Sequence, residues 1–144
     1  MNRIASRVLT LLLSSAAAAQ VPDLGVHDLD APLWDRRPRG EILVAGRDYK
    51  AEFSAAGARF VPFLGSDAPR NLPLDLALAA VELDGRPLEL RNAAPERKGE
   101  TVAYARGACV EDWVVTLDGI EQRFRFDELP ARGALTLAVA ARGE

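Results

Sequence analysis

The chain has 144 residues, 49% of them hydrophobic, with 18 Lys and Arg, 21 Asp and Glu and a net charge of −3. This length suits one domain with a single core. The negative charge and the lack of any Lys/Arg run argue against a phosphate-binding surface, so we predict no nucleic-acid partner. Cys109 is the only cysteine, which excludes a disulfide within the chain and leaves stability to packing.

The first 19 residues have the order of a secretory signal peptide. Arg3 and Arg7 give a positive start, 8–13 is a short apolar stretch, and small residues follow up to Ala19. An A-x-A-like site at 17–19 predicts cleavage before Gln20. The apolar stretch is too short for a membrane span, which takes about 20 apolar residues. We therefore predict a signal peptide at 1–19, no membrane span, and a product that is secreted or on the cell surface, with the periplasm as another location.

Residues 20–40 form an extended lead-in with three prolines, several aspartates and little periodicity, and Trp34 is its candidate contact with the core. From residue 41 onward, short apolar runs alternate with turn signals at the spacing typical of an all-β domain. We expect this domain to cover 41–144. Candidate strands lie at 41–44, 49–53, 58–64, 74–83, 88–90, 101–105, 109–117, 120–126 and 135–139.

Three of these segments carry the clearest local signals. Tyr49, Ala51 and Phe53 alternate with charged residues, as in a strand with one buried face. The leucines of 74–83 begin at intervals of two, which favours a strand over a helix. Asp84-Gly85 predicts a tight hairpin, because both central residues of a type I′ turn need positive φ.

The last third of the chain has the most regular alternation. One predicted face of 109–117 contains Cys109, Glu111, Trp113, Val115 and Leu117, and we expect its Trp113, Val115 and Leu117 to point into the core. After a turn at Asp118-Gly119, the next strand alternates Ile120, Gln122, Phe124 and Phe126 with charged residues, and Phe124 and Phe126 should meet that core. We predict an all-β fold, a two-layer antiparallel β-sandwich of roughly eight or nine strands.

Reactive side chains are few. His27 is the only histidine, and Ser54 and Ser66, the only serines after the leader, lie outside a G-x-S-x-G motif. Cys109 lacks a second histidine that would activate it, so a buried inert thiol is expected, with pairing to another chain as the minor alternative. Glu111 and Asp112 are adjacent on a strand and point to opposite faces, so they cannot act together on one bond.

Two binding signals remain weak. Asp28 and Asp30, with Asp23 and Asp35, could supply calcium ligands, but no D-x-[DN]-x-[DN]-G loop is present. A sugar-stacking platform could use the aromatic residues Trp34, Trp113, Tyr49 and Tyr104, although the alternation assigns Trp113 to the core. We therefore predict no catalytic, cofactor-binding or metal-binding residues and no cofactor.

Two stretches carry a resemblance to a known module. Arg47–Phe53 with Gly57–Pro62 is similar to its early hairpin, and 104–115 with Asp118–Phe124 is similar to its later one. The chain resembles the N-terminal β-rich module of large exported bacterial surface proteins of planctomycete or myxobacterial type, which continue into FG-GAP or other β-repeats. The resemblance implies no catalytic residues. The chain departs from the pattern by stopping at Glu144, which leaves a truncated gene, a fragment and a stand-alone version open.

Together these observations favour a non-enzymatic exported β-sandwich module with a structural or adhesive role at the cell surface. Its partner would be a protein or a polysaccharide. A carbohydrate-binding module is the alternative, and a small secreted hydrolase is the least favoured because nucleophile and base are both lacking.

Overall fold

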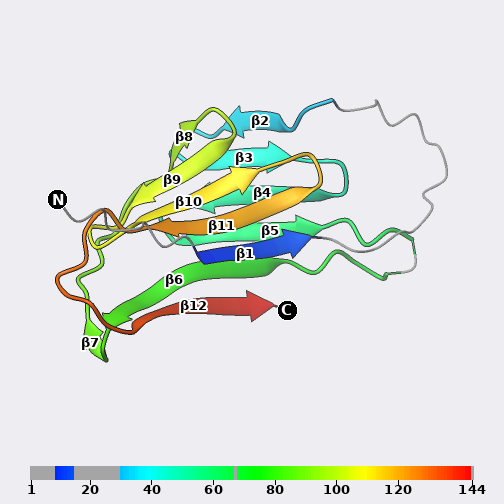
Figure 1. Cartoon of the computed structure of the whole chain (residues 1–144). Helices are drawn as coiled ribbons and strands as arrows, with labels where there is room; N and C mark the ends of the chain where they lie inside the picture. Colours follow the sequence, from blue (N-terminus) through cyan, green and yellow to red (C-terminus); the bar gives the residue numbers. More distant parts are fainter. Residues whose placement is uncertain (1–8, 15–29, 67, 144) are drawn as a thin grey trace.

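Alternation of apolar and polar residues produces a two-layer antiparallel sandwich in the computed structural model (Figure 1). The structure describes the backbone of residues 9–14 and the whole of residues 30–66 and 68–143. The described strands are β1 (Leu9–Ser14), β2 (Leu33–Arg36), β3 (Ile42–Ala45), β4 (Tyr49–Ser54), β5 (Gly57–Pro62), β6 (Leu74–Leu83), β7 (Arg86–Pro87), β8 (Glu96–Lys98), β9 (Thr101–Ala105), β10 (Val110–Val115), β11 (Gly119–Arg125) and β12 (Leu135–Gly143).

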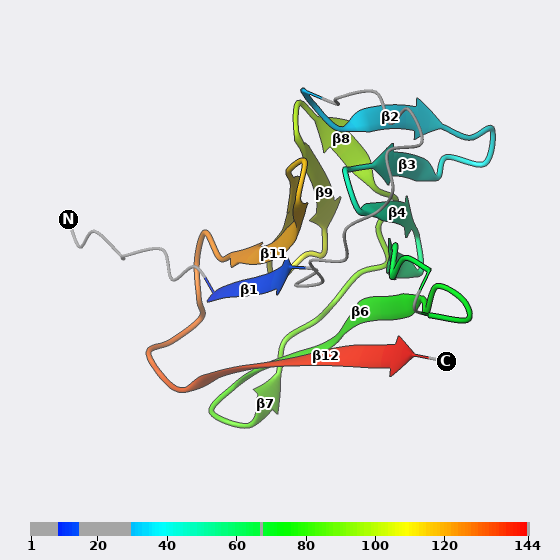
Figure 2. The same cartoon turned by 90° about the vertical axis from the view of Figure 1, so that its right-hand side faces the viewer.

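The strands form two sheets. The first sheet has the order β1-β11-β10-β9-β8, and the second has the order β12-β6-β5-β4-β3-β2, with β7 paired to β6. All pairs are antiparallel, and Figure 2 shows the two layers from the side. The predicted all-β sandwich is therefore confirmed.

The described strands outnumber the eight or nine expected. Among the additional ones, β2 lies in the lead-in and β8 in a polar stretch, both at sheet edges. Backbone pairing with a neighbouring strand holds β2 and β8 in place, so these two strands form without an apolar–polar alternation in their own sequences. The predicted return strand at 88–90 is wrong: β7 covers Arg86–Pro87, and beyond it a single bond from the Leu88 N–H to the Val81 carbonyl, at 2.8 Å, follows before the chain leaves β6. Leu90 makes only an isolated bridge to Gly107.

Two local predictions about the second sheet are confirmed. Asp84 and Gly85 both have positive φ, 50° and 73°, as the tight hairpin requires. The 74–83 segment is strand β6, and its ladder with β12 skips Ala79. This β-bulge shifts the alternation by one residue, so Leu76 before it and Val81 after it are both buried.

The interior contains two groups of buried side chains. The first cluster joins the middle strands of both sheets and consists of Ile42, Val44, Tyr49, Ala51, Phe53, Ala58, Phe60, Leu76, Val102, Tyr104, Trp113, Val115 and Ile120. The second cluster has a smaller buried set, Val81, Cys109, Phe124 and Phe126, and is surrounded by half-buried leucines from β12 and the loops.

Strand β1 falls within the predicted signal peptide. The rest of that peptide, 1–8 and 15–19, lies outside the described residues. Over Leu9–Ser14 the backbone pairs with β11 in a six-residue antiparallel register, from Leu9 opposite Phe124 to Ser14 opposite Gly119. Cleavage before Gln20 therefore stays a prediction, and it would remove one edge strand of the first sheet.

Candidate functional site

The most polar part of the interior is a hydrogen-bonded group around Glu111, which we call the Glu111 network. The Glu111 side chain is fully buried on β10. Its Oε2 accepts from Nε of Arg106 at 2.9 Å. Its Oε1 accepts from Nε1 of Trp113 at 3.0 Å and from Nε2 of Gln122 at 2.9 Å. The carboxylate is thus neutralised by a buried guanidinium and bonded by two further donors.

The strand register explains why these residues meet. Glu111 lies opposite Tyr104 on β9 and opposite Phe124 on β11, so this cross-strand row joins the first cluster to the second. The Arg106 guanidinium also stacks over the Tyr104 ring at 4.5 Å. A buried ion pair is tolerated only when its remaining donors and acceptors are satisfied. Here Oε1 of Gln122 is the single buried side-chain oxygen or nitrogen, among the residues described, that has no partner.

The sequence pattern placed Glu111 on the Trp113 face of its strand and made it half of an adjacent carboxylate pair, without predicting a hydrogen-bonded network. The opposite-face prediction holds: Glu111 points into the sandwich, whereas Asp112 bonds Nε of Arg125 at 2.5 Å on the outer side. The signal for the network was nevertheless present, because Glu111 and Gln122 occupy in-phase positions between core residues. A carboxylate on a buried face requires a buried cation, and Arg106 is a nearby candidate.

Cys109 is buried, as expected, with 4% of its surface exposed. Burial, reinforced by the Glu111 charge, raises the pKa of its thiol to about 11. A thiol with this pKa is almost wholly protonated near neutral pH and is a poor nucleophile. This environment agrees with the inert-thiol prediction.

Three of the four aromatic residues considered for a sugar platform are inside the core. Trp113, Tyr49 and Tyr104 are fully buried. Each tyrosine donates its hydroxyl across the sandwich: Tyr49 to the Thr116 carbonyl at 2.6 Å, and Tyr104 to the Gly57 carbonyl at 3.1 Å. Burial raises the pKa of both hydroxyls well above the usual value. These side chains connect the two sheets.

Trp34 is the remaining aromatic candidate, and it is half-buried on β2. It packs against the first cluster, as its predicted contact with the core requires. The guanidinium of Arg97 lies over its ring at 4.0 Å, and its Nε1 donates to Glu100 Oε2 at 3.2 Å. The ring therefore already has a cation as its stacking partner, which weakens the sugar-platform hypothesis.

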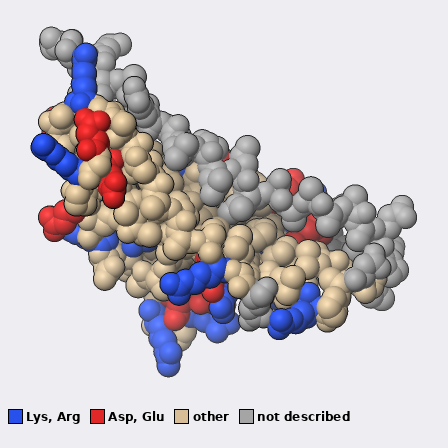
Figure 3. Space-filling view, turned by 90° about the horizontal axis from the view of Figure 1, so that it is seen from below, with Lys and Arg blue, Asp and Glu red and all other residues tan. Residues whose placement is uncertain are grey.

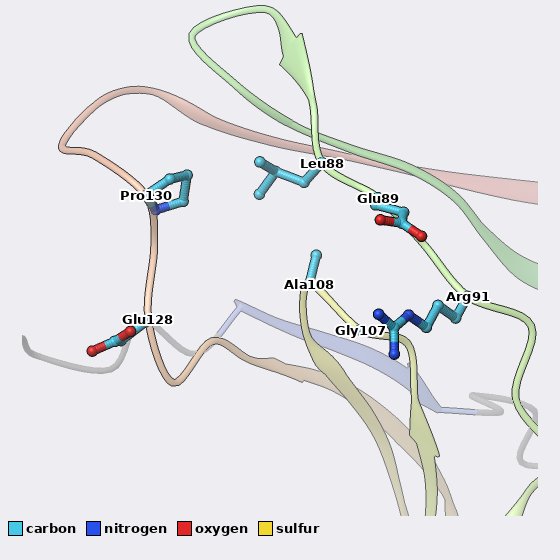
Figure 4. Close-up of a pocket in the computed structure, with 7 residues that line it drawn as sticks. All are labelled: Leu88, Glu89, Arg91, Gly107, Ala108, Glu128 and Pro130. Carbon is cyan, nitrogen blue, oxygen red and sulfur yellow. The ribbon is translucent and has the colours of Figure 1, made fainter.

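An open hollow of about 300 Å³ lies at the end of the sandwich where the β9–β10 and β11–β12 connections meet 88–91 (Figure 4). Its charged lining residues are Glu89, Arg91 and Glu128, and Leu88 and Pro130 form an apolar side. Among the described residues that line it there is no cysteine, serine or histidine. These described residues provide charge and apolar surface.

A second hollow, of about 490 Å³, lies over β4, β5, β6 and β12. Its charged lining includes Arg59 and Asp75, whose side chains form an ion pair at 2.8 Å. This pair holds the pKa of the Asp75 carboxyl below its usual range. Ser54 also lines the hollow, and its hydroxyl accepts from the Ala56 N–H at 3.2 Å.

The weak metal and triad candidates do not converge. His27, Asp23 and Asp28 lie outside the described residues. Asp30 and Asp35 are exposed, and the described part of the chain contains no group of three or more acidic, histidine or cysteine side chains that could hold a metal ion. Within the same part, no helix is both long and apolar enough to cross a membrane.

Comparisons of the chain with protein-family models, with curated proteins and with solved structures found no match. The resemblance to the exported surface-protein module therefore remains a prediction.

Proposed function

We propose that the protein is a non-enzymatic β-sandwich module of the bacterial cell exterior, with a structural or adhesive role. The observation that carries the proposal is the state of its interior polar groups. Glu111, Arg106 and Trp113 hydrogen-bond inside the core, and the Cys109 thiol is buried with a raised pKa. These groups hold neighbouring strands together inside the core, which supports a structural use of them.

The surface of the module supports contact with a macromolecule more than enclosure of a small one. Both hollows described above are open, and within the part of the chain that the structure describes their linings contain charged and apolar residues without cysteine. On the face seen in Figure 3, charged side chains form several groups in which basic and acidic residues lie next to each other, and uncharged surface separates these groups. This mixed pattern is unlike the single-sign stripe that phosphate backbones require.

Carbohydrate binding, the alternative, has less support. Stacking of a sugar needs an accessible aromatic face, and Trp34 has Arg97 over its ring. Affinity electrophoresis of the protein against a panel of polysaccharides tests this alternative directly. Retardation that is lost in Trp34→Ala would favour it over the structural or adhesive role.

Export is the part of the proposal that is tested first. A C-terminally tagged full chain is produced in a bacterial host, and its location and intact mass are measured. We expect a product in the envelope or medium that begins at Gln20. A matched variant with Leu11→Arg and Leu12→Arg interrupts the apolar stretch of the leader and should remain in the cytoplasm. A wild-type product confined to the cytoplasm would contradict the proposal.

The role itself is tested with the exported product. Beads coated with this product are incubated with cells and isolated envelopes of the bacterium that naturally encodes the chain. The fraction of beads retained is compared with that of albumin-coated beads. Saturable retention supports an adhesive or structural contact. Turnover of ester, glycoside or peptide substrates by the purified product would contradict a non-enzymatic role.

A further inference from the structure

We infer that, once the leader has been removed, the β11 edge of the first sheet binds an extended strand of a partner protein. The strand would be uncharged, would have aliphatic residues at alternate positions, and would run antiparallel to β11. This inference rests on the proposed function, because export is the step that removes β1 from this edge.

In the full chain, β1 pairs with the β11 edge, and its register indicates which strand fits this edge. Leu9, Leu11 and Leu13 of β1 are in register with Phe124, Gln122 and Ile120 of β11. These three β11 residues are the inward-facing ones, each with 2% or less of its surface exposed. Directly opposed residues of an antiparallel pair share one face of the sheet. The edge is therefore matched to a strand with aliphatic residues at every second position.

The second argument comes from the other edges of the sandwich. An edge strand presents unpaired N–H and C=O groups, and short or charged edges discourage further pairing. Strand β2 ends in Asp35-Arg36, and β8 consists of three exposed residues, Glu96 to Lys98. Strand β12 also has a free edge, but no described segment lies on it. Removal of β1 would leave β11 as an edge of seven residues, longer than β2 or β8, and its charged residues are paired within the sheet.

The third argument is charge. The outward-facing residues of β11 already have partners within the sheet: Arg123 bonds Glu121 Oε2 at 2.5 Å, and Arg125 bonds Asp112. The edge thus offers backbone groups and an inner face formed by Ile120, Phe124 and the amide of Gln122, with its neighbouring charges neutralised. An uncharged strand suits this surface, as in recognition by β-strand addition, where backbone bonds give affinity and alternate side chains give selectivity.

The test begins with the full chain, so that folding occurs with β1 in place. A protease site inserted after Ala19 allows the leader to be cut after folding, and a fluorescent peptide with the Leu9–Ser14 sequence and terminal lysines is then added. We expect saturable binding by anisotropy, with one peptide per chain. A Leu11→Lys peptide should bind about 100-fold more weakly, because its lysine is directed at the buried face.

The matched control is a Leu12→Lys peptide. Position 12 is in register with Glu121 on the outward face, so affinity should change by less than about 3-fold. Equal binding of the two lysine peptides, or no binding of the parent peptide, would overturn the inference. Dimerisation of the cut chain that the parent peptide cannot reverse would identify a second copy as the occupant and overturn the partner assignment.

The intact mass of the exported product separates this inference from the proposed function. A product that keeps its leader would refute both the predicted cleavage and the removal of β1 from the β11 edge. A correctly cleaved product that does not bind the parent peptide would refute only strand binding. In the supporting case the exported product, without any nicking, binds the parent peptide and discriminates between the two lysine variants.

Discussion

The two core clusters differ in how completely they are closed. In the first cluster Tyr49 stacks on Phe60 with ring centroids 5.3 Å apart, and Phe53 lies 6.0 Å from Trp113. Two tyrosine hydroxyls also cross between the sheets at this end. The second cluster has four buried residues, and the inward leucines of β12 around it remain partly exposed.

This contrast separates the part of the domain that stabilises the fold from the part that is available for contact. Regions with few fully buried apolar side chains open at a lower free energy than the closed core does. The second cluster includes Phe124 of β11, and β11 is the strand whose edge we propose as a binding site. A partner strand at this edge would extend the sheet next to the less enclosed cluster.

The largest expected effect is at the border between the clusters. Glu111→Leu leaves the buried Arg106 guanidinium without its anion and frees two further donors, so we expect a loss of about 3–5 kcal/mol of unfolding free energy. Urea denaturation measures it. The double variant Glu111→Leu/Arg106→Leu should recover part of the loss, because an apolar pair removes both charges together while the Trp113 and Gln122 donors still lack their acceptor.

The matched control for this cycle is Arg47→Ala. Arg47 also pairs with a carboxylate, Asp118, but both side chains are more than half exposed, so the loss should be no more than about 1 kcal/mol. If the double variant at 111 and 106 were as unstable as the sum of its single variants, the Glu111 network would not act as one unit.

A graded series sharpens the comparison within the second cluster. Phe124→Ala should cost about 3–5 kcal/mol, because its side chain is 1% exposed and would leave a cavity. Leu137→Ala on β12 should cost about 1 kcal/mol, because only part of that side chain leaves water on folding. Arg123→Ala, one residue from Phe124 on the outer face, should stay within about 0.5 kcal/mol. The three denaturation midpoints should therefore be well separated, and equal small losses would mean that the β11 register is wrong.

Alternation was sufficient to predict β4, β10 and β11, because each has one face that is fully buried, while the other face is mostly less buried, with Asp112 of β10 as an exception. It also placed Trp113 and Phe124 in the core. It failed at β8, whose residues are all charged, since that strand is held by backbone pairing with β9. Local pattern carries no information about pairing with a distant strand, which is why charged edge strands are overlooked.

The candidate site was less predictable than the fold. No motif marks the Glu111 network, since its members come from the two strands β10 and β11 and from the loop residue Arg106. Glu111 and Gln122 could be recognised only as polar residues in phase with core positions, and their bonding depends on the pairing of β10 with β11. The pairing of Leu9–Ser14 with β11 was hidden for a different reason, because the same apolar residues suit a signal peptide.

The smallest expected effect concerns Cys109 in the second cluster. Its thiol has an ordinary pKa near 9 when the chain is unfolded and a pKa of about 11 when folded. The unfolded chain therefore loses this proton first, so the unfolding free energy is unaffected below about pH 9 and falls as the pH rises toward 11. Urea midpoints measured across this range should decline more steeply for the wild type than for Cys109→Ala. The two buried tyrosines add a further decline at higher pH, but they are present in both proteins and cancel in the difference. Parallel pH profiles would mean that the second cluster opens enough to hydrate the thiol, and the two halves of the core would then differ more than their buried surfaces indicate.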